Sequence, residues 1–483
     1  MQETIVLYPA PGMGHIVSMV ELGKLILCRH HHHHLSVTVL LITSPHEPPT
    51  TTSYATHVTR TTPSIIFHRF PLLSTPQNTS PTRSRAAMAF EFIRLNTPNV
   101  LNALQSISTT STIKALVIDL FCTSAFHVAS DLNIPTYYFF TSGASALAAF
   151  LYLPTIHNQN TQSFKDLTNT YLHFPGLPPI RASHMPEPLL DRDDPAYLDF
   201  IYFTSHLPKS RGILTNTFKA LEPKAIKVIA EGVCVPDSPT PPVYYIGPLV
   251  ADADGRAEDG DGSGPVECLS WLDAQPSRSV VFLCFGSRGT FSAAQLKEIA
   301  TGLERSGQRF LWVVRDPPLT DEEVRTRSSS RHEEPDLEAL LPEGFLGRTK
   351  DRGMMVKTWA PQVQVLSKES VGGFVTHCGW NSVLEAVCAG IPMVAWPLYA
   401  EQHLNRVVLV EDMKVAMPME AAEDGFVSAD EVEKRVKALM ESEEGRDLRE
   451  RSRKMRKEAI ATWGEGGTSS VESTKLTESW NRV

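Results

Sequence analysis

Two residues in the first half of the chain have the chemistry of a proton-transfer pair. The run Gly12-Met13-Gly14-His15 follows a strand-like apolar segment at 4–8 and opens a helical pattern. Because histidine has a reference pKa of about 6.5, His15 suits a general base at the carboxyl end of a strand. A histidine that caps the helix or fills space is an equal alternative on position alone.

Asp119 ends a second buried run, 115–118, and also lies at the carboxyl end of a predicted strand. An aspartate that binds one ring nitrogen of a histidine fixes the tautomer and stabilises the imidazolium formed on proton transfer. A helix N-cap for the segment after Phe121 is another common use of aspartate. The spacing alone leaves open whether Asp119 contacts His15.

A denser group of polar residues occupies the second half, at the start of a predicted helix and after a neighbouring strand. Its members at these two places are His377, Asn381, Ser382 and Ser287. A helix N-terminus binds phosphate through its dipole and its unpaired N–H groups. The group therefore indicates a phosphate site, whereas core or capping roles are plausible for each residue singly but poor for the set.

Other residue types in this half suit the remaining parts of a sugar nucleotide. Glu385, one turn into the same helix, is able to reach a ribose diol, and Trp359 offers a flat face for a base. Glu401 and Gln402 supply a carboxylate and an amide for sugar hydroxyls. Together these residues predict a nucleotide site with extra polar groups.

The elements that must position these residues alternate between short apolar runs and longer helical patterns, which predicts βα units and parallel sheets. Strands are expected at 4–8, 36–42, 64–69, 115–119, 136–140, 279–285, 309–315, 353–356, 373–376 and 393–396. Helices are expected at 16–28, 88–106 and 293–306. The apolar stretch 137–153 is too short and too interrupted for a membrane span and is expected to be a buried strand followed by a packed helix.

A chain of 483 residues is too long for one hydrophobic core, so at least two domains are expected. The Pro-, Gly- and Asp-rich stretch 236–265 reads as a linker with a mobile loop. We expect an N-terminal domain over 1–245, a linker over 246–265, a C-terminal domain over 266–460 and a last helical segment over 461–483. In doubly wound sheets ligands bind beyond the carboxyl ends of the strands.

Composition excludes several classes of function. The net charge of -9 argues against a nucleic-acid or anionic-membrane surface. Seven scattered cysteines without a CxxC pair argue against a zinc site or a disulfide framework. No secretory signal is recognisable, so a cytoplasmic location is expected. The five histidines at 30–34 lack ordered spacing and are expected to form a solvated loop.

The segment 359–402, WAPQVQVLSKESVGGFVTHCGWNSVLEAVCAGIPMVAWPLYAEQ, closely resembles the box that defines plant secondary-product glycosyltransferases of family 1. It matches in order and length without a gap. The likeness extends to the PGMGH start, the Asp119 strand end, and the LCFGS and LPEGF segments. It implies an α/β chain with the GT-B fold: two Rossmann-like domains facing across a cleft, with a C-terminal helix that packs back on the first.

The resemblance also implies a role for each matching residue. His15 is the catalytic base and Asp119 its partner. Trp359 stacks on uracil with Ala360 and Gln362 nearby, and Glu385 holds the ribose. The residues that hold the diphosphate are His377, Asn381, Ser382 and Ser287. The residues that contact glucose are Trp380, Glu401 and Gln402, with Thr141 on the other side.

The implied reaction is a single inverting displacement. His15 removes the acceptor proton, the acceptor attacks the anomeric carbon of UDP-glucose, and UDP leaves from the opposite face to give a β-glucoside. Helix N–H groups and His377 stabilise the leaving diphosphate, so neither a metal nor another cofactor is expected. Trp380 and Gln402 are of the glucose-using type. We also expect a monomer with no membrane or nucleic-acid partner.

The implied acceptor is a small plant-type phenolic such as a flavonoid, chalcone or benzophenone. Transfer to oxygen is the first expectation, and transfer to a carbon of a phloroglucinol-type ring is the alternative, because a phenolate carries negative charge at both atoms. Candidate residues for the acceptor wall are Phe121, Met88 and Phe200.

Three rival functions are less consistent with the residues. A nicotinamide-dependent oxidoreductase requires a third glycine where this chain has Val17. A non-catalytic UDP-sugar-binding module predicts loss of His15 or Asp119, and both are present. A serine hydrolase predicts a GxSxG-like elbow, which is not evident in the sequence.

Overall fold

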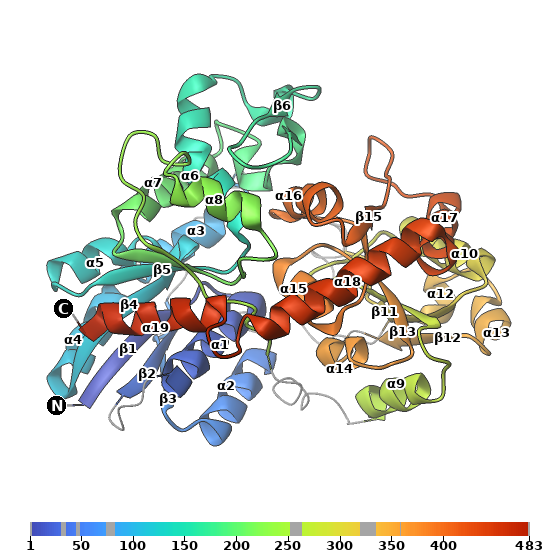
Figure 1. The fold of residues 1–483 in the computed structure, drawn as a ribbon, viewed down its shortest axis with the longest axis horizontal. Helices are drawn as coiled ribbons and strands as arrows, with labels where there is room; N and C mark the ends of the chain where they lie inside the picture. Colours follow the sequence, from blue (N-terminus) through green and yellow to red (C-terminus); the bar gives the residue numbers. More distant parts are fainter. Residues whose placement is uncertain are drawn as a thin grey trace. The chain divides into compact units, whose positions relative to one another are not determined.

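The computed structural model of the chain describes residues 2–29, 35–44, 49–73, 83–251, 263–318, 335–357 and 359–481 (Figure 1). The histidine run 30–34 and most of the expected linker lie outside these residues. The chain forms two compact units. Unit 1 contains Met1–Ala251, Tyr399–Leu404 and Glu458–Val483, and unit 2 contains Asp252–Leu398 and Asn405–Lys457. Unit 1 therefore includes two segments from the second half of the sequence.

The sheet of unit 1 is parallel throughout, with strand order β3-β2-β1-β4-β5-β8-β9. The strands are β1 (Gln2–Tyr8), β2 (Leu35–Leu41), β3 (Ile65–Arg69), β4 (Ser111–Asp119), β5 (Thr136–Phe140), β8 (Gly212–Thr215) and β9 (Val243–Tyr245). Their order reverses between β1 and β4. In an open α/β sheet, this switch point is where ligands bind.

Helices connect these strands and cover the sheet. They are α1 (Met13–Arg29), α2 (Pro49–Thr61), α3 (Arg85–Leu95), α4 (Thr97–Thr110), α5 (Ala125–Asp131), α6 (Ala144–Gln159), α7 (Pro195–His206) and α8 (Pro223–Ala230). The five strands expected in this half are confirmed to within a few residues. The apolar stretch 137–153 is confirmed as a buried strand, β5, followed by a packed helix, α6.

The prediction of a single helix over 88–106 is wrong, because the chain breaks into α3 and α4 at Asn96. Pro98 occupies the first turn of α4, where its missing N–H leaves no helical hydrogen bond unmade. The Asn96 side chain donates to the carbonyl of Phe92, and its backbone N–H donates to that of Ile93. Asn96 thus ends one helix and begins the next.

The sheet of unit 2 repeats this arrangement, with the parallel order β12-β11-β10-β13-β14-β15. Its strands are β10 (Val280–Cys284), β11 (Arg309–Val314), β12 (Gly353–Lys357), β13 (Val371–Thr376), β14 (Met393–Ala395) and β15 (Ala416–Pro418). The order reverses between β10 and β13. Both units therefore have the doubly wound, Rossmann-like topology expected from the sequence.

Helices also connect the strands of unit 2. The main helices of this half are α9 (Ser263–Asp273), α10 (Ala293–Ser306), α14 (Gln362–Leu366), α15 (Trp380–Ala389), α16 (Gln402–Val407), α17 (Ala429–Glu441) and α18 (Glu443–Ala461), of which α16 begins in unit 1 and α18 ends in it. Of these, α10 has the expected bounds. No helix among the described residues is long and apolar enough to cross a membrane.

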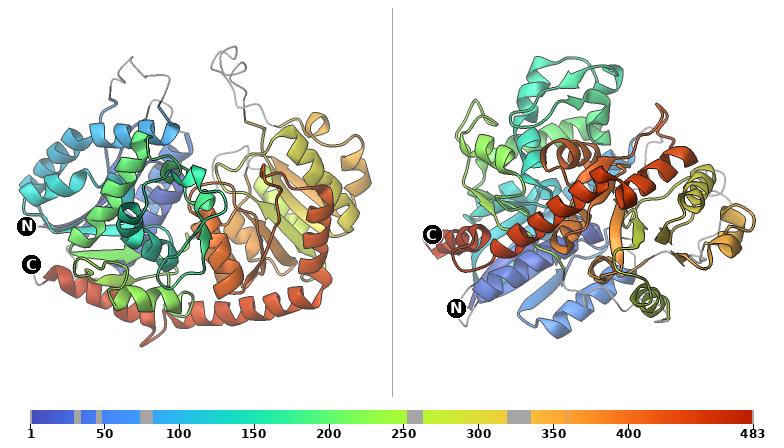
Figure 2. Two further views of the ribbon diagram at one scale, coloured as in Figure 1. Left: turned by 90° about the horizontal axis from the view of Figure 1, so that it is seen from above. Right: turned by 45° about the vertical axis from the view of Figure 1, so that its right-hand side comes forward.

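The last helix, α19 (Thr468–Asn481), packs against α1, β4 and β9 of unit 1 (Figure 2). Trp480 is 1% exposed, and its ring meets that of Tyr137 edge-on with centroids 6.1 Å apart. Just before the helix, the indole N–H of Trp463 donates to the carbonyl of Pro248. Buried aromatic area and hydrogen bonds thus attach this helix to the sheet of unit 1.

Candidate active site

His15 and Asp119 lie together at the switch point of unit 1, because their strands are neighbours in the sheet. His15 is in the first turn of α1, just after β1, and Asp119 is the last residue of β4. The Nδ1 atom of His15 lies 2.8 Å from Oδ2 of Asp119. Gly12 makes the turn into α1 with φ of +123°, which only glycine adopts without strain, and its carbonyl accepts from the N–H of His15.

Asp119 has both of the uses that the sequence leaves open. Its Oδ1 accepts from the backbone N–H of Phe121 and caps the short helix after β4, while Oδ2 binds the His15 ring. Asp119 is 1% exposed, whereas the His15 side chain is 32% exposed. A carboxylate at Nδ1 directs the basic lone pair of the imidazole to Nε2. The pair has the geometry of a positioned general base.

Aromatic side chains surround this pair. The ring of Phe121 meets His15 edge-on with centroids 5.8 Å apart, and Phe90 of α3 stacks on Phe121 at 5.2 Å. Phe200 lies 6.1 Å from Phe121 but is only 2% exposed, so it supports this wall from behind. Met88 is 37% exposed. Phe90 was not among the residues predicted for this wall. The sequence feature that pointed to it was its position on the same predicted helix as Met88.

Thr141 also lies beside His15. Its hydroxyl oxygen is 3.4 Å from His15 Nδ1. The residue follows β5, which is the neighbour of β4 in the sheet. Three consecutive strands of unit 1 therefore present polar side chains at the same edge.

His377 lies at the switch point of unit 2, as His15 does in unit 1. His377 follows β13, and Ser287 follows β10, the neighbouring strand in the sheet. The His377 side chain is deeply buried, and this desolvation lowers its pKa from 6.5 to about 4. The ring is therefore neutral at pH 7. It can stabilise a phosphate by donating an N–H, whereas the helix N-terminus of α15 supplies the partial positive charge.

Two glycines form a narrow slot for the His377 ring. A Cβ added to Gly286 would lie 2.5 Å from Nε2, and one added to Gly379 would lie 3.0 Å from Cε1 and closer still to Nε2. Gly286 also has φ of +74°. Gly379 has ordinary dihedral angles, φ of −62° and ψ of 134°, so its requirement for glycine is purely steric. The slot fixes the plane in which His377 presents its ring nitrogen.

A hydrogen-bonded trio joins α14 to α15. The side-chain amide of Gln362 donates to the hydroxyl of Ser382 at 2.8 Å and to Oε2 of Glu385 at 2.5 Å. Gln362 thereby fixes the orientation of the Glu385 carboxylate. The structure thus brings together three residues that the sequence predicts to hold a nucleotide.

The loop before α15 is held by a residue that sequence reasoning missed. The side-chain amide of Asn405, which is 2% exposed, donates to the carbonyl of Cys378 at 3.0 Å. Cys378 has φ of +64°, an uncommon conformation for a residue with a Cβ. No sequence pattern signals this contact, because Asn405 follows the recognisable segment.

The other predicted donor-binding residues of unit 2 lie on the same loops. Trp380 and Asn381 begin α15, with Trp380 only 4% exposed. Trp359 and Ala360 follow β12, with Trp359 half-buried and Ala360 3% exposed. The carbonyl of Ser287 accepts from the guanidinium of Arg315 at 2.6 Å.

Glu401 and Gln402 belong to the segment of the second half that groups with unit 1. The side-chain oxygen of Gln402 accepts from the N–H of Tyr399 at 2.9 Å. Ala400 has φ of +55°. The Glu401 carboxylate accepts from the hydroxyl of Ser142 at 2.9 Å.

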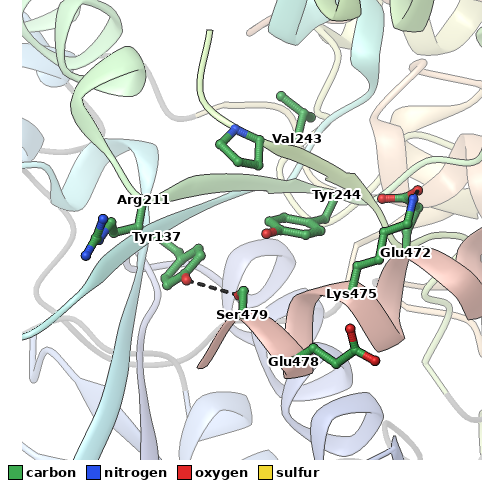
Figure 3. A pocket seen from close by; sticks show the side chains of 9 residues that line it. Tyr137, Arg211, Val243, Tyr244, Glu472, Lys475, Glu478 and Ser479 are labelled. Atoms are coloured by element: carbon green, nitrogen blue, oxygen red, sulfur yellow. Dashed lines mark hydrogen bonds and ion pairs between the residues drawn. The ribbon is translucent and has the colours of Figure 1, made fainter. Parts of the chain in front are cut away.

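A separate groove of about 680 Å³ lies where α19 meets β5, β8 and β9 of unit 1 (Figure 3). Its polar side chains are largely paired with one another, since Tyr137 bonds Ser479 and Lys475 bonds Glu472. The groove is thus a packing seam and not the site of chemistry. Among the described residues, no group of three or more His, Cys, Asp or Glu side chains is placed to hold a metal ion.

Comparisons with known proteins point to one family. A family model described as UDP-glucoronosyl and UDP-glucosyl transferase matches residues 246–448. UDP-glycosyltransferase 88F3 of Pyrus communis is 59% identical over 474 residues, covering 97% of this chain and 98% of that protein. Phloretin 2'-O-glucosyltransferase of Malus domestica is 57% identical over 476 residues, with the same two coverages.

A solved structure of Phytolacca americana UGT2, complexed with UDP-2fluoro-glucose and pterostilbene, superposes with a TM-score of 0.86 at 36% identity. The match covers 99% of this chain and 100% of that one. Sequence similarity and fold therefore agree: the chain belongs to the plant UDP-glycosyltransferases of family 1 and has their GT-B fold.

Proposed function

We propose that the protein transfers glucose from UDP-glucose to a hydroxyl group of a small plant phenolic, forming a β-O-glucoside. The observation that carries this proposal is the His15–Asp119 pair, with Nδ1 and Oδ2 2.8 Å apart, next to the aromatic wall of Phe121. This is a proton acceptor facing a surface suited to a planar aromatic molecule.

The proposed reaction begins with the phenolic proton. Asp119 accepts the Nδ1 proton of His15 in a hydrogen bond, so the lone pair on Nε2 takes the proton of the acceptor. The phenolate oxygen attacks the anomeric carbon while the bond from that carbon to the UDP oxygen breaks on the opposite face. The proton remains on Nε2, where Asp119 stabilises the imidazolium, and the sugar is inverted.

The residues of unit 2 support the donor half of this proposal. Glu385, held at one oxygen by Gln362, is the proposed ribose ligand, and Trp359 is the proposed partner of the uracil ring. His377, Asn381, Ser382 and Ser287 are the proposed ligands of the diphosphate. Because backbone N–H groups and a neutral imidazole stabilise the negative charge of the leaving diphosphate, we propose that the reaction needs no metal ion.

The acceptor class is supported by the aromatic wall and by the relatives. Phe121 and Phe90 form a stacked pair beside His15. A relative at 57% identity is named as a glucosyltransferase for the 2'-hydroxyl of phloretin. A hydroxylated aromatic skeleton of that size is therefore the first acceptor to test.

The decisive experiment is mass spectrometry of products made from UDP-glucose with a panel of chalcone, flavonoid and benzophenone acceptors. The proposal predicts the gain of one hexose that acid hydrolysis removes, with equal rates in EDTA and in magnesium. A hexose that survives acid and fragments across the sugar ring would replace the O-glucoside with a carbon–carbon bond. Loss of activity in EDTA that magnesium restores would overturn the metal-free mechanism.

A further inference from the structure

The turn between β5 and α6, residues Thr141, Ser142 and Gly143, touches two parts of the proposed chemistry at once. Thr141 lies beside the His15 ring. The hydroxyl of Ser142, the next residue, donates to Oε1 of Glu401 at 2.9 Å. Ser142 is 7% exposed and Glu401 is half-buried, so this hydrogen bond is partly shielded from competition with water. A single turn therefore lies against both the base and the carboxylate proposed to bind the sugar.

This turn is held rigidly by a buried carboxylate. Gly143 at the start of α6 has no side chain to cap the helix, and Glu222 does so instead. Its carboxylate accepts from the N–H groups of Ala144 at 2.7 Å and Ser145 at 2.8 Å. The same carboxylate accepts from the hydroxyl of Thr217 at 2.5 Å. Burial raises the pKa of Glu222, and these three donors oppose that effect.

A second contact fixes the Ser142 backbone itself. The hydroxyl of Thr215, at the end of β8, donates to the Ser142 carbonyl at 2.9 Å. Because the carbonyl and the following helix are both anchored, the direction of the Ser142 hydroxyl is set by the scaffold of unit 1 and not by a mobile loop.

The segment that carries Glu401 is held in a similar way. The side-chain oxygen of Gln402 accepts from the N–H of Tyr399 and closes a turn. The rings of His403 and His184 stack with centroids 4.5 Å apart. These contacts fix the backbone of the segment. A glutamate side chain still has three rotatable bonds, and only a contact at its carboxylate selects one rotamer for binding.

We propose that Ser142 is a positioning residue for the donor sugar: its hydroxyl binds Oε1 of Glu401 and fixes the rotamer in which this carboxylate meets the sugar hydroxyls. The inference rests on the proposed function, in which Glu401 binds glucose. The proposal assigns part of the sugar recognition to the turn after β5, which also carries Thr141. It also predicts a selective effect, because uridine and diphosphate do not depend on this rotamer.

The test compares Ser142→Ala with Ser210→Ala. Ser210 is a buried serine of unit 1 whose hydroxyl bonds only to the carbonyls of Leu207 and Gly212, so it controls for the loss of a buried hydroxyl. For Ser142→Ala we expect the KM for UDP-glucose to rise about tenfold, as for one lost hydrogen bond to a charged group. The Kd of UDP and the KM of the phenolic acceptor should stay within twofold of the parent values.

A second readout uses UDP-galactose, which differs in one hydroxyl. The ratio of kcat/KM for UDP-glucose to that for UDP-galactose should fall in Ser142→Ala and stay unchanged in Ser210→Ala. An unchanged ratio together with an unchanged KM for UDP-glucose would overturn the proposal.

A double-mutant cycle separates positioning from an independent role of Ser142. If Ser142 acts through Glu401, Ser142→Ala should have no further effect on the KM for UDP-glucose in a Glu401→Ala background. Full additivity of the two effects would overturn the proposal. Failure of the underlying function would look different, since the parent enzyme would then transfer no glucose to any phenolic acceptor.

Discussion

The two histidines at the switch points of the two sheets occupy similar places but have opposite surroundings. His15 is one-third exposed and bound to the carboxylate of Asp119. His377 is buried between Gly286 and Gly379, and this burial lowers its pKa to about 4. The two rings therefore differ in their nearest charged group and in their access to water, and burial opposes the charged form of His377. The same side chain is therefore suited to accept a proton in unit 1 and to remain a neutral hydrogen-bond donor in unit 2.

The difference shows that residue type and strand position are not sufficient to assign a role. A charged partner and access to solvent distinguish a base from a ligand. Substitutions that change one environment at a time test whether this distinction is real.

The largest effect is expected for His15→Ala. Removing the proton acceptor should lower kcat/KM by about 10³- to 10⁴-fold, the upper part of the range for general base catalysis. The Kd of UDP, measured by calorimetry, should stay unchanged because the proposed UDP ligands are on unit 2. His173→Ala, at an exposed position of unit 1, is the matched control. A His15→Ala enzyme that retained full turnover at a pH where the phenol is protonated would contradict the assignment.

Asp119→Asn should have the next largest effect, a loss in kcat/KM in the lower part of the about 10²- to 10⁴-fold range for general acid–base catalysis. The amide oxygen can still cap the N–H of Phe121, but the amide nitrogen then donates to His15 Nδ1 and leaves the proton on Nε2. Residual activity should rise with pH as the phenol ionises without help. Asp131→Asn, at an exposed site, should be silent. Unchanged activity and an unchanged pH profile would show that Asp119 is only a helix cap.

Gly379→Ala addresses the other histidine. The added Cβ would overlap the His377 ring, whereas the backbone there accepts alanine. We expect UDP to bind about tenfold more weakly, the cost of roughly one displaced hydrogen bond, with no change in the pH dependence set by His15. Gly347→Ala is the control, because its Cβ would meet no atom within 4 Å. Equal UDP affinity in both variants would mean that His377 does not contact the donor.

The smallest expected effect concerns stability and pH. Because the pKa of His377 is about 4 when folded and about 6.5 when unfolded, the unfolded chain binds a proton between these values that the folded chain does not. The free energy of unfolding should therefore fall as the pH falls from about 6.5 to 4. This residue contributes up to about 1.4 kcal/mol per pH unit to that fall.

His377→Asn should make this decline shallower in urea titrations across the same pH range. His173→Asn, at an exposed position, should leave it unchanged. If the parent and His377→Asn curves were parallel, the buried histidine would titrate normally, and the contrast with His15 would disappear.

Much of the fold could be predicted because both sheets are buried on both faces. Apolar runs such as 5–8 in β1 and the whole of β10 stand out against helical patterns, so their carboxyl ends, and hence His15 and Ser287, could be placed from sequence. The break at Asn96 was missed because an apolar pattern continues on both sides of it. Side-chain contacts that end a helix are not visible in periodicity.

The environments of the site residues could not be predicted. Asp119 and His15 are 104 positions apart in the sequence, and the distance between them depends on the order of strands in the sheet, which pairs β1 with β4. The slot around His377 depends on a loop from β10 meeting one from β13. The contact of Glu401 with Ser142 joins residues 259 positions apart and has no local pattern.

The packing of α19 on unit 1 has a consequence for exchanging parts between related enzymes. A hybrid joined near residue 251 would place the native Tyr137 opposite a foreign counterpart of Trp480, and the native Ser142 opposite a foreign counterpart of Glu401. The segments that must be exchanged together are therefore not encoded by one continuous stretch of the gene. A hybrid that returns to the parental sequence at 399–404 and again from 458 would preserve both contacts.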